Sequence, residues 1–274
     1  MIGAFKTSTA GMKNVQAQLD TIANNIANVN TASYKKQGQE FKDFLYESIE
    51  KVEVDKNKNS EVKPSMIQIG RGSKIAATRR SFEVGNITQT SNKFDFAIDG
   101  DGFFEVITTG GERMYTRDGR FKTSTSEETG ETALVTAEGY PIVDEEGEYI
   151  TIPEEVNMST LTVDGEGKFL YKNTDGEMVD TGIVLRTVLF KNNQGLEAKG
   201  DNLYKKTLAS GEPITEADEN TKKGEIKQGF VEMSNVKVVE EMVNLITAQR
   251  AYELNSKVIQ AADEMLSQVN NLRR

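Results

Sequence analysis

The stretch that decides the fold is FKTSTAGMKNVQAQLDTIANNIANV, residues 5–29. Its apolar residues recur every seven positions in two interleaved series, the spacing of the a and d positions in a left-handed coiled coil. One series is Phe5, Met12, Leu19 and Ile26, and the other is Val15, Ile22 and Val29. The residues between them are largely Gln, Asn, Lys and Asp, with no proline. The pattern therefore predicts a long helix over 3–29 with one narrow apolar stripe.

A second apolar stripe occupies the other end of the chain. Its members are Val236, Val239, Val243, Ile246, Leu254, Val258, Ala261, Met265 and Leu272. Ser234 or Asn235 is a suitable N-cap, so we expect a helix that begins there and runs to the C-terminus. Helix-breaking residues avoid both ends, since only three of the 23 glycines precede residue 48 and none follows Gly229. The two terminal helices are therefore expected to form a common module.

The two stripes are the candidate functional surface. Burying one stripe of each helix once makes two helices this long only marginally stable against their backbone entropy, so we expect further copies to pack against them. The sequence leaves open whether the N-terminal stripe packs on its own C-terminal partner or on that of a neighbour. The candidate subunit-packing residues are Phe5, Met12, Val15, Leu19, Ile22, Ile26, Val29, Val239, Val243, Ile246, Leu254, Val258 and Met265, and the candidate polar registry residues are Asn25, Asn28 and Arg250.

The middle of the chain has the pattern of an all-β domain. Asp-Gly pairs such as Asp99-Gly100 and Asp164-Gly165 favour hairpin turns and alternate with short runs of Phe, Val and Ile. The fold class is therefore α+β, with long terminal helices forming a coiled-coil module and an all-β central domain. The expected parts are an N-terminal helical segment (1–47, with a turn and a short helix in 31–47), a charged connector or arm (48–69), the β-rich domain (70–229, with surface loops at 123–131 and 215–224) and a C-terminal helical segment (230–274).

Composition excludes several classes of function. The chain has no Cys, His or Trp, which removes disulfides, Cys/His metal sites and catalysis by His or Cys. The helical ends are close to neutral, so the middle holds nearly all of the net charge of −10. No basic face for nucleic acid is present in this pattern. We also expect no membrane insertion, because no apolar run approaches the length of a membrane span.

The remaining motifs favour turns and solvated charge over chemistry. Asp99-Gly100-Asp101-Gly102 begins like a calcium loop but lacks the later ligands, and Gly70-Arg71-Gly72 lacks the order of a phosphate loop. Paired carboxylates such as Glu145-Glu146 and Glu240-Glu241 are expected in solvent-facing turns or on a helix surface. We therefore expect no enzyme, no cofactor and no metal. An acidic-pair carbohydrate-cleaving enzyme is the remote alternative.

Three parts of the chain resemble one family. IANNIANVNTASYKK (22–36) and GFVEMSNVKVVEEMVNLITAQRAYELNSKVIQAADEML (229–266) resemble the N- and C-terminal signatures of the bacterial flagellar rod and hook proteins. IDGDGFFEV (98–106), YTRDGRF (115–121) and LVTAEGYPI (134–142) resemble the β-domain core of that family. The distal rod members are the most similar, through FKDFLYESIE, QIGRG, GLEAKGDNLY and ASGEP.

The resemblance implies a structural subunit of the flagellar basal body. It implies self-assembly into a helical tube whose terminal helices form the inner coiled-coil layer around an export channel. It implies torque transmission and, through a segment at about 46–69, rod stiffness. The implied partners are copies of the chain, other rod proteins, the hook protein, surrounding ring proteins and the flagellar type III export apparatus, which exports it across the cytoplasmic membrane without a cleaved signal. A proximal rod or hook subunit is the alternative within the family.

Overall fold

The structure is a computed structural model that describes residues 2–48, 68–125, 132–152, 158, 160–173, 177–215 and 223–272. It divides into two compact units. The helical unit comprises Met1–Ala27, Gln37–Arg80 and Lys237–Arg274, and the β unit comprises Asn28–Lys36 and Ser81–Val236. Most of the expected connector, at 49–67, and most of the two expected loops, at 126–131 and 216–222, lie outside the described residues.

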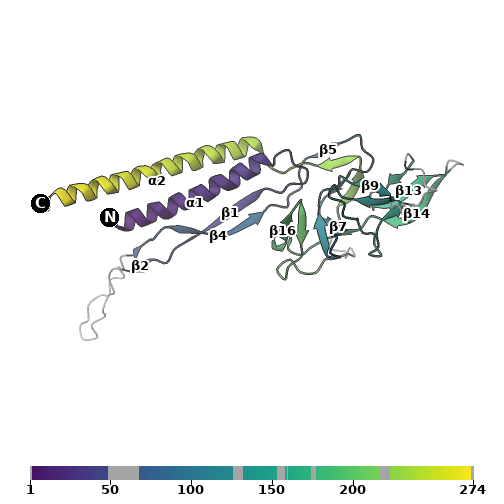
Figure 1. Cartoon of the computed structure of the whole chain (residues 1–274), viewed down its shortest axis with the longest axis horizontal. Helices are drawn as coiled ribbons and strands as arrows, with labels where there is room; N and C mark the ends of the chain where they lie inside the picture. The colour runs from purple at the N-terminus through teal and green to yellow at the C-terminus, as the bar shows by residue number, and fades with distance from the viewer. Residues whose placement is uncertain are drawn as a thin grey trace, which may run out of the picture. The chain divides into compact units, whose positions relative to one another are not determined.

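The helical unit pairs the two ends of the chain. Helix α1 (Ile2–Ala27) and helix α2 (Val238–Leu272) lie side by side, and α1 lies between α2 and a two-stranded ribbon (Figure 1). The ribbon is formed by β1 (Gln37–Asp43) and β4 (Ser73–Arg80), which are antiparallel, and the short β2 (Glu47–Ser48) and β3 (Gln68–Ile69) pair next to them. Neither helix in the described part of the chain combines the length and apolar content that crossing a bilayer requires.

The ribbon corrects one expectation. A short helix was predicted within 31–47, but residues 37–43 form strand β1. Its polar side chains are used against α1, since the Gln39 amide donates to the carbonyl oxygen of Ala17 at 2.8 Å and to the hydroxyl of Thr21 at 2.7 Å. Residues 73–80 pair with β1, so they belong to the helical unit, whereas the sequence placed everything from residue 70 in the β domain.

Helix α2 begins later than its cap residues suggested. It starts at Val238, three residues after Asn235. Asn235 instead contacts the β unit, where its side chain accepts the backbone N–H of Lys36 at 2.7 Å and donates to the carbonyl of Ser81 at 2.9 Å, and the Ser234 hydroxyl accepts the backbone N–H of Val236 at 3.2 Å. These contacts hold the backbone away from helical geometry until it leaves the β unit.

The β unit is built from several small sheets, as the turn pattern predicted. The largest has the order β15-β7-β8-β17-β16, two have three strands (β11-β10-β9 and β12-β13-β14), and two are pairs (β18-β6 and β19-β5). The strands are β5 (Ile87–Gln89), β6 (Phe96–Asp99), β7 (Phe103–Ile107), β8 (Arg113–Thr116), β9 (Lys122–Thr125), β10 (Thr132–Val135), β11 (Thr151–Ile152), β12 (Thr162–Val163), β13 (Lys168–Lys172), β14 (Met178–Val184), β15 (Thr187–Val188), β16 (Glu197–Gly200), β17 (Leu203–Lys205), β18 (Glu225–Gln228) and β19 (Phe230–Glu232), with a short 3₁₀ helix at Asn193–Gly195.

The glycine turns serve different purposes. Asp164-Gly165 lies in the β12–β13 hairpin as predicted. Asp99-Gly100 instead begins a corner between two sheets, because β6 pairs with β18 while β7 pairs with β8 and β15. The β7–β8 hairpin turns at Gly110-Gly111, where both glycines are exposed and no atom lies within 4 Å of an added Cβ.

Two apolar clusters form the interior of the β unit. The larger contains the buried aromatic rings of Phe96, Phe104, Phe121 and Phe169 together with aliphatic residues from several sheets. The smaller contains Phe103, Tyr115, Val188, Phe190, Leu196 and Tyr204. Its aromatic rings meet edge to face. Residues 123–125, expected in a surface loop, continue β9 because they pair with β10.

Candidate functional site

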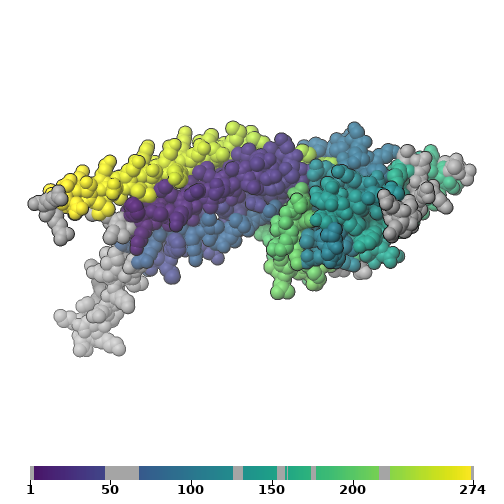
Figure 2. All heavy atoms as spheres, viewed as in Figure 1, coloured from purple at the N-terminus to yellow at the C-terminus, as the bar shows by residue number. Residues whose placement is uncertain are grey.

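The buried residues on the face of α2 that meets α1 are small or polar, and Leu245 and Ile259 are half-buried beside them. Glu241, Ala248 and Ala262 are the buried members of this face, and the half-buried Asn255 falls at the same seven-residue spacing. A Cβ added at Gly11 of α1 would lie 3.3 Å from the Asn255 side-chain amide, so the helices approach closely there. Figure 2 shows α1 and α2 in contact along their length. Small residues permit this approach, and few apolar side chains are used for it.

The apolar stripe of α2 points away from α1 into solvent. All six candidate packing residues on this helix are exposed, from 76% for Val239 and 62% for Leu254 to 47% for Ile246 and Val258, with Val243 and Met265 between. These exposed apolar residues lie on one side of the helix, with Arg250 and Lys257 among them, and so many of them on one face are unusual for a monomeric soluble protein.

The stripe of α1 is divided between interior and surface. Phe5 is 44% exposed, Ile22 is buried, and Met12, Val15, Leu19 and Ile26 are half-buried. Val29 lies beyond the helix in the β unit. The structure thus brings most of the α1 stripe near other elements of the helical unit, but it leaves the α2 stripe uncovered.

Asn25 is a polar contact between the two helices. Its amide donates to the carbonyl of Gln37 at 2.9 Å and to the carboxylate of Glu241 at 3.3 Å, and its side-chain oxygen accepts the N–H of Gln37 at 2.9 Å. Asn25 and Glu241 are each 1% exposed. Glu241 lies in the first turn of α2, where the helix dipole favours a carboxylate. Its burial corrects the expectation that the Glu240-Glu241 pair is solvated.

The other two registry candidates are placed differently. Asn28 lies in the β unit just after α1, and its side-chain oxygen accepts the Thr31 hydroxyl at 3.1 Å. The Asn28 carbonyl also accepts the backbone N–H of Thr31, so this residue helps to end the helix. Arg250 is exposed on α2.

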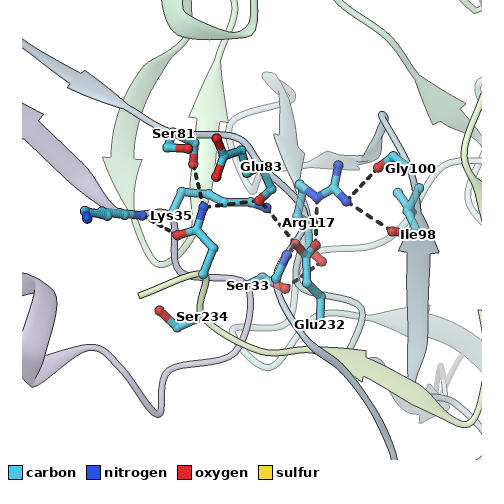
Figure 3. A network of polar contacts seen from close by, with 12 residues as sticks. Ser33, Lys35, Ser81, Glu83, Ile98, Gly100, Arg117, Glu232 and Ser234 are labelled. Atoms are coloured by element: carbon cyan, nitrogen blue, oxygen red, sulfur yellow. Dashed lines mark hydrogen bonds and ion pairs between the residues drawn. The ribbon is translucent and has the colours of Figure 1, made fainter. Parts of the chain in front are cut away.

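A second buried polar group, which sequence reasoning missed, lies in the β unit (Figure 3). We call it the Glu232 cluster, and its members are Ser33, Lys35, Arg117 and Glu232. The carboxylate of Glu232 accepts the Lys35 ammonium at 2.6 Å and the Arg117 Nε–H at 2.8 Å. The side chains of these three residues are at most 2% exposed. Ser33 donates its hydroxyl to the Arg117 carbonyl at 2.8 Å.

Backbone groups complete the cluster. Three further Arg117 N–H groups donate to the carbonyls of Ile98, Gly100 and Gly102 at 2.9–3.1 Å, which fixes the corner between β6 and β7. The Lys35 ammonium also donates to the carbonyl of Glu83 at 2.7 Å. The charges are therefore paired and hydrogen-bonded, as burial requires.

The pKa values of Lys35 and Glu232 are both lowered, which disfavours the ammonium and favours the carboxylate. Desolvation, followed by repulsion from Arg117, lowers the pKa of Lys35 to about 8 despite the attraction of Glu232. Desolvation also opposes ionisation of Glu232, but Arg117 and Lys35 outweigh it and hold the pKa of that carboxyl below its ordinary value. At neutral pH the cluster is therefore a charged one.

Nothing in the described residues gathers the groups of a metal site. The part of the chain that the structure describes contains no cluster of three or more His, Cys, Asp or Glu side chains that could hold a metal ion. The clusters around Asn25 and Glu232 are closed by protein contacts on several sides, so their geometry suits holding chain segments in place.

Comparison with known proteins identifies what these features belong to. Three family models match, described as "Flagella basal body rod protein" over residues 5–35, "Flagellar hook protein FlgE/F/G D1 domain" over 97–171 and "Flagellar basal body rod FlgEFG protein C-terminal" over 227–272. Among solved structures, the Helicobacter pylori flagellar hook protein FlgE2 matches 62% of this chain and 47% of its own at 15% identity and a TM-score of 0.24, too low to define the fold.

Curated relatives match from end to end. The flagellar basal-body rod protein FlgG of Borreliella burgdorferi is 41% identical and is matched over 100% of both chains. The FlgG protein of Caulobacter vibrioides is 38% identical over 98% of this chain and 99% of the relative. In Bacillus subtilis, FlgG is 36% identical and the flagellar hook-basal body complex protein FlhP 31% identical, each over 100% of both chains.

A helical unit formed by the two chain ends and a β unit formed by the middle, with these matches at both ends and in the middle, define a member of the flagellar rod and hook protein family. Within it, the chain belongs to the family of flagellar basal-body rod proteins FlgG. It is a structural subunit of the flagellar rod, located in the basal body.

Proposed function

We propose that the chain is a distal rod subunit that assembles with copies of itself into a helical tube, in which terminal helices of neighbouring copies pack as a coiled coil. The tube transmits torque from the motor to the hook and encloses the export channel. The proposal rests on family membership and on one observation, the exposed apolar stripe of α2. A band of this length lowers its free energy when it is removed from water.

The stripe favours neighbouring copies as its cover. The inward face of α2, whose buried residues are Glu241, Ala248 and Ala262, is already occupied by α1. The outward residues Val239, Val243 and Ile246 are four and three positions apart, the spacing of knobs-into-holes packing against another helix. The two helical ends are close to neutral, so like copies can approach there with little repulsion.

The wider setting is proposed from the family. Other rod proteins, the hook protein, surrounding rings and the type III export apparatus are the proposed partners, with export across the cytoplasmic membrane and no cleaved signal. The chain acts as a scaffold and not as an enzyme. Residues 48–69 are the proposed rod-type arm. A sibling role is disfavoured by the higher identity to FlgG than to FlhP in Bacillus subtilis.

A charge placed in the stripe tests the proposal. Val243→Asp and Leu254→Asp should leave the monomer folded and abolish rods, because a carboxylate in a buried helix seam remains unpaired. Gln249→Asp is the matched control, since Gln249 is exposed on the same helix but lies outside the stripe. Circular dichroism measures folding and electron microscopy measures assembly. Rods formed by the two stripe variants in normal yield would overturn the proposal.

A further inference from the structure

Three segments of the β unit lead directly to the helical unit along the chain. We call them the connecting segments. They are residues 28–36, which follow α1 and precede β1, residues 81–85, which follow β4, and residues 232–236, which precede α2. Any force that passes between the units through the backbone must pass through them.

Glu232, in the third connecting segment, binds both of the others. Its Oε1 accepts the Lys35 ammonium at 2.6 Å and the backbone N–H of Gly85 at 2.8 Å. Its own carbonyl accepts the backbone N–H of Ser33 at 2.8 Å. One residue therefore makes contacts with the first and second segments at the same time, through its side chain and its backbone.

Asn235, three residues before the start of α2, repeats this arrangement. Its side-chain oxygen accepts the N–H of Lys36 at 2.7 Å, and its amide donates to the carbonyls of Ser81 at 2.9 Å and Glu83 at 3.1 Å. Figure 3 shows Ser81, Glu83, Lys35 and Glu232 in one network. The three segments are thus joined twice, once by a charged side chain and once by an uncharged one.

The backbone around these contacts is tightly constrained. A Cβ at Gly85 would lie 2.0 Å from the carbonyl oxygen of Met233, so the second and third segments touch where only glycine fits. Ser33 has a φ of 57°, a left-handed conformation that costs a non-glycine residue free energy, and it is fully buried. Its hydrogen bonds to Glu232 and Arg117 hold it there.

Stability alone does not account for a buried charged cluster. Desolvating the ions offsets much of their mutual attraction, and in proteins apolar residues of similar size often stabilise a fold equally well. Buried, directional pairs do favour one arrangement over its alternatives, because every other arrangement leaves a charge unpaired. The cluster is therefore suited to fixing which segments lie together.

We propose that Glu232 and Asn235 form a clamp that joins the three connecting segments into one element, so that they hold or release together and share an applied load. The load-sharing part rests on the proposed function as a torque-transmitting rod. The joining of the segments does not depend on that function.

Hydrogen exchange on the full-length chain tests the joining. Glu232→Gln keeps the side-chain shape but removes the charge, and amide exchange should rise by about tenfold or more in peptides covering 31–36 and 81–86 as well as 230–236. Exchange in peptides covering β7, which lie outside the connecting segments, should rise much less. Asp99→Asn is the matched control, since it removes an exposed ion pair with Lys227. A rise confined to 230–236, or an equal rise throughout the β unit, would overturn the clamp.

Asn235→Ala provides a second variant should Glu232→Gln fail to fold. It removes no charge, and exchange should rise in 31–36 and 81–86 while β7 stays protected; unchanged exchange in both segments would again count against the clamp.

Load sharing by the three connecting segments is tested in cells that assemble rods from this chain. Glu232→Gln rods should form but rotate more slowly than wild type in viscous medium, and equal speed would overturn load sharing alone. A failure of the wild-type chain to form rods would overturn the proposed function and leave the exchange result standing.

Discussion

At the scale of single residues, the most constrained group is the ion pair of Lys35 with Glu232. The sequence places Lys35 in a family signature, but nothing in the linear order brings residues 35, 117 and 232 together. Charged residues are seldom buried, so the sequence alone favours exposed positions for these three side chains. Asn25 was predicted to set registry, and its hydrogen bonds to Gln37 and Glu241 remain inside one chain. Whether it sets registry between copies stays a prediction.

The lowered pKa of Lys35 makes stability depend on pH. In the unfolded chain this ammonium titrates near its ordinary value of 10.5, and in the folded chain near 8. Between these values the unfolded state binds more protons, so the free energy of unfolding rises with pH. Relative to Lys35→Met, wild type should gain up to about 1.4 kcal/mol per pH unit from pH 8 to 10.5. Urea unfolding of both proteins measures this, and a difference that is flat or falls with pH contradicts it.

Breaking the buried pair should cost far more than breaking an exposed one. Glu232→Gln leaves Lys35 and Arg117 without their carboxylate, and we expect a loss of about 3–5 kcal/mol in the free energy of unfolding. Asp99→Asn, which breaks a surface pair with Lys227, should cost less than about 1 kcal/mol. Chemical denaturation compares the two variants. Equal losses would show that the cluster contributes no more than a surface pair.

At the scale of elements, the sequence predicted both terminal helices and most of the β pattern. It could not say which face of α2 meets α1, because Glu241, Ala248, Asn255 and Ala262 recur with the same seven-residue spacing that makes an apolar stripe conspicuous. Strand β1 was missed for a related reason. Its polar residues satisfy α1 and β4, and this contact between distant segments is invisible in local periodicity.

The close approach of the helices should be sensitive to added volume. Ala248 is 3% exposed against α1, so Ala248→Leu must push the helices apart and should cost about 1–3 kcal/mol. Val243→Leu adds volume to the exposed stripe of the same helix, and its effect on the monomer should stay within about 0.5 kcal/mol. Thermal unfolding followed at 222 nm measures both. A neutral Ala248→Leu would mean that α1 and α2 do not pack this way in solution.

At the scale of the whole molecule, the family and the α+β class were predictable because the signature residues span both ends and the middle. The exact boundaries between the two units were less predictable. Residues 28–36 belong to the β unit although they follow α1 directly, since Ser33 and Lys35 are held by Glu232. Among the described residues of the middle, most acidic side chains are exposed, as at Glu145-Glu146, which fits a solvated surface.

The lack of cysteine makes assembly contacts measurable. Single cysteines placed at Ile246 or Leu254 have no native thiol to compete with them. If the stripe is covered by neighbouring copies, either thiol should react at least about tenfold more slowly with a maleimide in assembled rods than in dilute monomer, because burial excludes the reagent. A cysteine at Gln249, outside the stripe, is the comparison. Equal slowing at all three positions would argue against a specific seam.

The open β7–β8 turn at Gly110-Gly111 offers a practical use. Its glycines have empty space around them, and both are exposed, so the backbone there can accept added residues without displacing a neighbour. It is separated in sequence from the stripes, the Asn25 contact and the clamp. A short epitope inserted between Gly110 and Gly111 would therefore let an antibody mark where along the basal body this chain resides.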